Sequence, residues 1–292
     1  MSFELDIIRM IQSIRTGWLD TIMILLTELG DQMVFIGIVV FLYWFIDKKI
    51  AFKMTYAFIF SAVANELLKG IIGRNRPYVE DPSLNVGDPT HGFAFPSGHA
   101  QNIAVESTIL YQNFNKKVSW LKWVLLAAMI IVPLTRMYLG QHYLSDVLAG
   151  LIIGMMLAYG IALLVDKMGD KEHIWGLIVL IPLMIALIVL AFLPTVYEEV
   201  KNIYVALGGY AGFMFGYTID KLWIKYNDKP AKIKILWRAL VGIAGVAILY
   251  FGLSVVFKAV SPENVYLDFT RYALIGLWGS AGAMSTFKAL KV

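Results

Sequence analysis

Residues 174–197 read IWGLIVLIPLMIALIVLAFLPTVY, a run of 24 residues without a charged side chain. A helix needs about 20 mostly apolar residues to cross a bilayer, so this run is long enough to span a membrane. Three other uncharged runs, at 147–165, 202–219 and 239–257, have comparable lengths. These four runs predict a polytopic helical membrane protein.

The composition of the whole chain agrees with this prediction. Of its 292 residues, 59% are apolar and 16% are charged, whereas soluble domains average about 45–50% and about 25%. This balance excludes a soluble enzyme, a nucleic-acid-binding domain and a disordered segment. The chain has no cysteine, which also excludes disulfides, thiolate catalysis and cysteine-ligated metals.

The hydrophobic pattern predicts an all-α membrane bundle with nine spans. They lie at 21–46, 50–70, 97–113, 118–136, 142–166, 174–194, 202–219, 235–257 and 269–287. Before them, residues 3–16 alternate apolar and charged side chains at helical spacing, which is typical of a helix lying in the membrane interface. We therefore expect three parts: an interfacial segment at 1–20, a membrane core at 21–170, and three additional helices at 171–292. Gly208, Gly209, Gly212 and Gly216 fit close helix packing.

The basic residues are divided unequally between the two sides that nine crossings define. One side carries sixteen of the 25 Lys and Arg residues, and the loop at 220–234 alone holds five lysines. Because cytoplasmic loops are enriched in Lys and Arg, we expect that side to be cytoplasmic. The opposite side carries the long loop 71–96, and long ordered loops tend to carry function.

Three groups of polar residues fall at the outer ends of neighbouring spans. The first contains Lys69 and Arg76, followed by Pro77. Arginine offers a planar fork that suits phosphate oxygens, and lysine offers a point charge. Turned inward, these two cations, or three if Arg74 between them is counted, form a receptor for a multiply charged anion; the alternative is that they reach outward to lipid headgroups.

The second group is Pro96-Ser97-Gly98-His99, at the start of the third span. Ser97 is a good N-cap, and the free N–H groups at a helix start bind anions. Gly98 lets the backbone approach a ligand closely. His99 then stands beside the bound anion and can donate or accept a proton.

The third group is Thr135-Arg136, followed by His142 and Asp146. His142 and Asp146 are four residues apart and share one helical face, so the carboxylate can hold one ring nitrogen and leave the other as a nucleophile. The alternative is a structural pair that closes the bundle. Because the three groups occur together with compatible chemistry, they indicate phosphoryl transfer through a covalent phosphohistidine.

The three groups resemble the motifs of the type-2 phosphatidic acid phosphatase superfamily, whose members share their core with vanadium haloperoxidases. The family motifs are Lys-x6-Arg-Pro, Pro-Ser-Gly-His and Ser-Arg-x5-His-x3-Asp. This chain departs from them only at Thr135, which keeps the hydroxyl of serine. The resemblance covers about residues 65–150, and the predicted nine-span layout resembles glucose-6-phosphatase of the same superfamily.

The resemblance implies a role for each matched residue. Lys69, Arg76 and Arg136 would clamp the phosphate, and Ser97 with the Gly98 N–H would complete the cradle. His142 would attack phosphorus and Asp146 would orient it. His99 would protonate the leaving oxygen and then activate water. The resemblance implies no metal and no cofactor.

Three further residues are candidates for substrate contacts. His91 lies close before the second motif and could touch a leaving group, although a loop histidine is more often solvated. Gln101 could line the pocket or support the helix cap. Asp31 could contact the cations, more plausibly as a buried ion-pair partner than as a catalyst.

The resulting expectation is a metal-independent phosphatase in a bacterial plasma membrane, with its active site on the extracytoplasmic side. Its partner would be a membrane lipid phosphate or diphosphate: undecaprenyl diphosphate, phosphatidylglycerophosphate or phosphatidic acid. The alternatives are a sugar-phosphate phosphatase that resembles glucose-6-phosphatase, a lipid transporter or flippase, and vanadate-dependent halide oxidation on the same scaffold.

Overall fold

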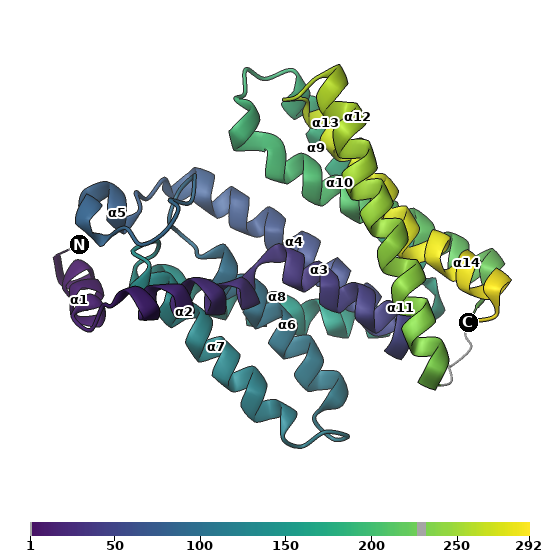
Figure 1. Cartoon of the computed structure of the whole chain (residues 1–292), viewed down its shortest axis with the longest axis horizontal. Helices are drawn as coiled ribbons and strands as arrows, with labels where there is room; N and C mark the ends of the chain where they lie inside the picture. Colours follow the sequence, from purple (N-terminus) through teal and green to yellow (C-terminus); the bar gives the residue numbers. More distant parts are fainter. Residues whose placement is uncertain (1, 227–231) are drawn as a thin grey trace. The chain divides into compact units, whose positions relative to one another are not determined.

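The computed structural model describes residues 2–226 and 232–292, which form helices joined by turns and by the longer loop 85–97, without a strand in these residues (Figure 1). The predicted all-α membrane fold is confirmed. Lys229, one of the five lysines in the predicted cytoplasmic loop, lies outside the described residues.

The chain divides into two compact units. Unit 1 comprises Met1–Val39 and Lys53–Leu164, and unit 2 comprises Val40–Phe52 and Val165–Val292. The following helices lie wholly or mainly in unit 1: α1 (Ser2–Gln12), α2 (Gly17–Thr27), η1 (Glu28–Gly30), α3 (Gln32–Phe41), α4 (Lys48–Ile72), α5 (Pro77–Glu80), η3 (Pro82–Leu84), α6 (Gly98–Phe114), α7 (Leu121–Tyr138) and α8 (Leu144–Met168).

Unit 2 contains the remaining helices. They are η2 (Leu42–Ile46), η4 (Gly169–Lys171), α9 (Glu172–Ala191), α10 (Tyr197–Ile219), η5 (Asp220–Ile224), α11 (Lys232–Ala247), η6 (Ile248–Gly252), α12 (Leu253–Val260), α13 (Val265–Leu277), η7 (Trp278–Gly282) and α14 (Ala283–Leu290). Close packing of α10 was predicted from its glycines. A Cβ at Gly212 would lie 1.9 Å from the Ala273 carbonyl oxygen, whereas one at Gly209 would meet nothing within 4 Å.

Four helical stretches of the described residues are long and apolar enough to cross a membrane: Lys48–Glu80, Leu121–Tyr138, Leu144–Ala191 and Lys234–Val260. A fifth is formed if Gly17–Gly30 and Gln32–Ile46 act as one span bent by 51°. The chain is therefore a multi-pass membrane protein, and the total of nine crossings stays a prediction.

The predicted span at 21–46 is broken rather than continuous. Asp31 has an extended backbone, and its side chain accepts a hydrogen bond from Met33 N–H at 2.7 Å, which starts α3 anew. Gly30 packs so tightly that a Cβ would lie 2.8 Å from the His99 carbonyl oxygen. The break thus brings the end of η1 against the start of α6.

Two glycines of α8 set its close approach to α6. A Cβ on Gly150 would lie 2.5 Å from the Ser97 carbonyl oxygen, and one on Gly154 would lie 2.5 Å from the Gln101 carbonyl oxygen. Small residues four apart let two membrane helices pack backbone to backbone. This contact brings the first turns of α6 and α8 together.

The turn from α7 to α8 also depends on a glycine. Gly140 has a φ of +69°, and a Cβ there would lie 2.2 Å from the Leu84 carbonyl oxygen. Glycine is the residue that adopts this left-handed conformation without steric cost. The turn delivers Gln141 and His142 to the end of unit 1 that carries the other two motifs.

Candidate active site

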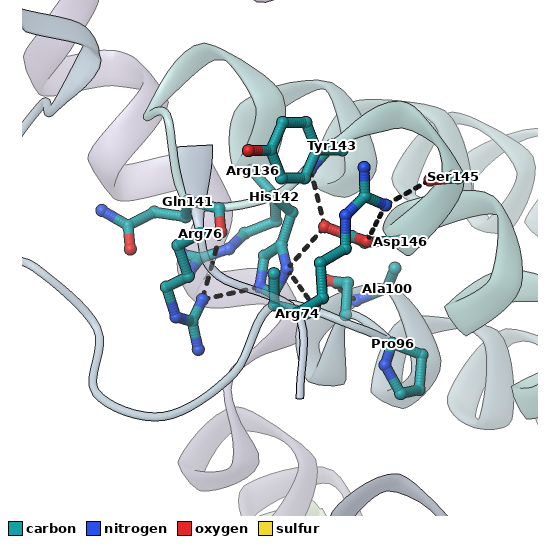
Figure 2. A network of polar contacts seen from close by, with 12 residues as sticks. Arg74, Arg76, Pro96, Ala100, Arg136, Gln141, His142, Tyr143, Ser145 and Asp146 are labelled. Atoms are coloured by element: carbon teal, nitrogen blue, oxygen red, sulfur yellow. Dashed lines mark hydrogen bonds and ion pairs between the residues drawn. The ribbon is translucent and has the colours of Figure 1, made fainter. Parts of the chain in front are cut away.

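The three polar motifs come together at one end of unit 1, as Figure 2 shows for the residues around His142. The Ala94 N–H donates to the Arg74 carbonyl oxygen at 2.8 Å, and the Ser97 N–H donates to the Asp146 carbonyl oxygen at 3.0 Å. Arg76 Nη1 lies 3.1 Å from His142 Nε2. Main-chain and side-chain bonds therefore join motifs that are far apart in sequence.

His142 is buried and held in one orientation. Its Nδ1 lies 2.8 Å from the Ala94 carbonyl oxygen. A carbonyl oxygen can only accept a hydrogen bond, so we assign the proton to Nδ1. The lone pair of the neutral ring then lies on Nε2, the nitrogen that faces Arg76 (Figure 2). Nε2 is therefore the ring nitrogen that can act as a nucleophile.

Asp146 lies beside His142, but the two do not share a helical face as predicted, because α8 begins at Leu144, and the bonds of Asp146 go elsewhere. Its Oδ2 is 3.8 Å from His142 Nδ1, which is longer than a hydrogen bond. Oδ2 accepts the Tyr143 N–H at 2.8 Å, and Oδ1 accepts from Arg74 at 2.7 Å. Asp146 therefore fixes the first turn of α8, and the Ala94 carbonyl orients the imidazole.

His99 occupies the first turn of α6 and is partly exposed. Its ring makes no hydrogen bond to any described residue, so both ring nitrogens are available to a ligand. It interacts electrostatically with His142 and with the three cations that also act on His142, which are Lys69, Arg76 and Arg136. This placement suits a group that exchanges protons with a substrate.

Three cations surround the two histidines: Lys69, Arg76 and Arg136 interact electrostatically with both rings. Arg76 is 2% exposed and donates to the main-chain oxygens of Gly92, His91 and Gln141. Arg136 is 4% exposed. Neither guanidinium has a carboxylate within 4.0 Å among the described residues.

Arg136 is also incompletely hydrogen-bonded. Its two terminal nitrogens donate to the hydroxyls of Thr27 and Thr90, both at 3.2 Å, and its Nε has no partner among the described residues. Lys69 is paired with Glu66 one helical turn earlier, at 3.1 Å. A buried cation without a counter-ion is costly, so this end of unit 1 is built to receive an anion.

The second motif forms the wall next to these cations. Ser97 is fully buried, and its Oγ accepts from the Ala100 N–H at 3.5 Å, as an N-cap does. The N–H groups of the first turn of α6, which include those of Gly98 and His99, have no partner within the helix. They add a positive helix end to the anion site.

The other candidates for substrate contacts have different surroundings. The imidazole of His91 is exposed, and its main-chain oxygen is what binds Arg76. Gln101 is 1% exposed and bonds to Ser61 and Asn65 of α4. Asp31 caps α3 and interacts electrostatically with Arg136, but the two side chains do not form the predicted ion pair within 4.0 Å.

Two charged residues at the site were not singled out from the sequence. Arg74 bonds to Asp146 and Ser145 and also to Glu4, which belongs to α1. Arg74 stands within the first motif, but motif spacing counted only the cations at its two ends. Glu4 gave no signal beyond its place on an amphipathic helix.

Two family models match this chain. The PAP2 superfamily model matches residues 50–170, and the model of the PAP2 superfamily phosphatase, transmembrane extension, matches residues 204–292. Together the two matches cover more than half of the chain. The first match includes all three motifs of the site.

Relatives and a solved structure agree with these matches. An undecaprenyl-diphosphatase of Sulfolobus acidocaldarius is 24% identical over 162 residues, 54% of this chain and 77% of the relative. Phosphatidylglycerophosphatase B of Bacillus subtilis is 29% identical over 157 residues, 50% of this chain and 75% of the relative. The crystal structure of Aquifex aeolicus LpxE has a TM-score of 0.50 at 25% identity, covering 54% of this chain and 93% of that one.

A helical membrane unit that gathers two histidines and three cations at one end defines a class of membrane phosphatases. This chain belongs to the PAP2 superfamily and is a multi-pass membrane enzyme that hydrolyses lipid phosphates or diphosphates. The family resemblance read from the three motifs is thereby confirmed.

Proposed function

We propose that this phosphatase acts on a lipid phosphate or diphosphate at the outer leaflet, through a phosphohistidine on His142 and without a metal. The observation that carries the mechanism is the orientation of His142. Its Nδ1 faces the Ala94 carbonyl at 2.8 Å, and its Nε2 faces Arg76 at 3.1 Å. This leaves a nucleophilic nitrogen directed at a phosphate-binding group.

The proposed reaction has two steps. In the first, His142 Nε2 bonds to phosphorus, the bond from phosphorus to the lipid oxygen breaks, and His99 gives its proton to that oxygen. In the second, His99 takes a proton from water, the water oxygen bonds to phosphorus, and the bond to Nε2 breaks. With a diphosphate the first leaving group is a lipid monophosphate; with a monophosphate it is an alcohol.

The cations have the role of binding and stabilising the phosphoryl group. Arg76 and Arg136 are buried without a carboxylate within 4.0 Å in the described part of the chain, so an incoming phosphate supplies their counter-charge. Donors aimed at the developing charge are commonly the largest contribution to catalysis. Lys69, Ser97 and the Gly98 N–H complete the proposed cradle.

A lipid substrate is supported by α1. This helix buries Ile8 in the core of unit 1 and leaves Phe3 and Met10, exposed by 72% and 69%, on its surface. Apolar side chains at this position suit a helix that rests on the bilayer surface. We propose that 1–20 is an interfacial segment, that 21–170 is the catalytic core, and that 171–292 adds three transmembrane helices.

The substrate class is tested by phosphate release from purified protein in lipid vesicles with excess chelator. The panel contains undecaprenyl diphosphate, phosphatidylglycerophosphate, phosphatidic acid and glucose 6-phosphate. We expect turnover of at least one lipid, none of the sugar phosphate, inhibition by vanadate, and no turnover by His142→Ala. Activity that persists in His142→Ala would rule out the phosphohistidine mechanism, and chelator-sensitive activity would rule out metal independence.

A further inference from the structure

Glu4 is the residue of α1 that reaches the active site. Its Oε1 accepts the Ser145 N–H at 2.9 Å, and its Oε2 accepts from Arg74 Nη2 at 2.5 Å. Burial alone would raise the pKa of Glu4, but the hydrogen bonds from Ser145 and Arg74 hold this pKa below its usual value. Glu4 is therefore an ionised carboxylate at neutral pH.

Arg74 links Glu4 to the nucleophile by two routes. Through its side chain, Nη1 donates to Asp146 Oδ1 at 2.7 Å, beside His142 (Figure 2). Through its main chain, the carbonyl oxygen accepts the Ala94 N–H at 2.8 Å, and the Ala94 carbonyl in turn holds His142 Nδ1. The orientation of the imidazole thus depends on where Arg74 lies.

The side chain of Arg74 is fixed on every side by groups of unit 1. Its guanidinium carbon lies 3.9 Å from the centre of the Tyr143 ring, and Nη1 also donates to Ser145 Oγ at 2.6 Å. Glu4 and Asp146 hold its two terminal nitrogens from opposite ends. Without Glu4, Arg74 Nη2 would lose its carboxylate partner. The Ser145 N–H, in the first turn of α8, would lose its acceptor.

We propose that Glu4 is a positioning residue for the nucleophile: through Arg74 and the first turn of α8 it fixes the orientation of His142. This inference rests on the proposed function, since it assumes that His142 attacks phosphorus. The helix that rests on the membrane surface then also completes the active site.

The docking of α1 does not depend on Glu4 alone, which makes the inference testable by substitution. Ile8 is fully buried with Leu84 and Tyr143, and Gln12 donates to the carbonyl oxygens of Leu84 and Tyr138 at 2.8 and 2.6 Å. These contacts remain in Glu4→Gln, which removes the charge and keeps the shape of the side chain. We therefore expect the variant to fold with α1 in place.

The test compares Glu4→Gln with Asp6→Asn, a matched loss of charge on the same helix. The side chain of Asp6 is 66% exposed and pairs with Arg9 away from the site. We expect Glu4→Gln to lower kcat by roughly tenfold to a hundredfold, as small misplacements of catalytic groups do, with KM nearly unchanged. Asp6→Asn should keep both parameters. Glu4→Asp, which keeps the charge and shortens the reach by one methylene, should give an intermediate kcat and replaces Glu4→Gln if that variant does not fold.

A double-mutant cycle with Arg74→Gln separates positioning from a merely structural effect. If Glu4 acts through Arg74, Glu4→Gln should lower kcat by a smaller factor in the Arg74→Gln background than in the wild type. Losses that multiply, a kcat of Glu4→Gln equal to that of the wild type, or a raised KM at constant kcat would each overturn the inference. His142→Ala, measured in the same series, tests the proposed function separately, because residual activity there contradicts the mechanism whatever Glu4→Gln does.

Discussion

Arg136 carries its charge in the interior of unit 1, and its only side-chain partners in the described part of the chain are the hydroxyls of Thr27 and Thr90, each at 3.2 Å. Hydroxyl groups do not neutralise a guanidinium, and its Nε is left without a partner among the described residues. The side chain is thus held in place and still has donors to spare. A phosphoryl group with negatively charged oxygens would supply both the counter-charge and an acceptor for the Nε donor.

Replacing this residue tests that interpretation. Arg136→Lys keeps the charge but loses the planar fork, so it should lower kcat/KM by roughly 10²–10³-fold, the usual effect of removing one donor to a developing charge. Vanadate should also inhibit the variant more weakly. Arg15→Lys is the control, because the side chain of Arg15 is 38% exposed and pairs with Asp20 rather than with a group of the site. Unchanged kcat/KM and vanadate inhibition in Arg136→Lys would remove Arg136 from the proposed phosphate cradle.

The sequence predicted which residues gather at the site better than it predicted their bonds. The spacing of His142 and Asp146 correctly predicted that the two residues lie side by side, but not that they share a helical face, because α8 begins only at Leu144. Which oxygen lies nearest Nδ1 depends on the path of the loop that carries Ala94, and periodicity says nothing about that path. The contacts of Glu4 with Arg74 and Ser145 could not be predicted either, because they follow from how α1 packs on segments that are distant in sequence.

The helices themselves were largely predictable, because uncharged runs of 18 or more residues leave few alternatives in a bilayer. The positions at which the helices are interrupted were not predictable. The bend between α2 and α3 follows from the cap at Asp31 and the tight packing of Gly30, which are tertiary features. The close contact of α6 and α8 did have a signal, because Gly150 and Gly154 stand four residues apart in an apolar helix.

That contact makes a prediction about α8. Gly150→Ala should reduce kcat by about a hundredfold, because its Cβ would lie 2.5 Å from the Ser97 carbonyl oxygen and would push the first turn of α8 from the cradle. Gly160→Ala on the same helix meets nothing within 4 Å and is the matched control. Both changes raise helix propensity by about 1 kcal/mol, so propensity cannot explain a difference between them. Equal kcat values in the two variants would show that α8 can shift without harm to the site.

The distribution of lysines along unit 1 makes a prediction about the side of the membrane on which the site lies. α6 and α7 each have one end at the site, marked by His99 and Arg136, and at the other end the chain carries Lys117 and Lys122. α6 has 17 residues, which corresponds to about 25 Å at about 1.5 Å per residue, most of the thickness of a hydrocarbon core. We therefore expect the lysines and the site to face opposite surfaces of the bilayer. Because Lys and Arg concentrate on the cytoplasmic surface, the positions of the lysines favour an active site that opens outward.

The absence of cysteine from the chain allows a direct test of this orientation. Asp88→Cys marks the loop whose residues His91 and Gly92 bond to Arg76, and Lys117→Cys marks the opposite end of α6; both positions are exposed. In intact cells a membrane-impermeant maleimide should label Asp88→Cys and leave Lys117→Cys unlabelled, and both should react once the membrane is permeabilised. Retained phosphatase activity in the two variants shows that the label reports on folded protein. The reverse pattern would put the histidines on the cytoplasmic side, and the substrate would then have to be a lipid phosphate of the inner leaflet.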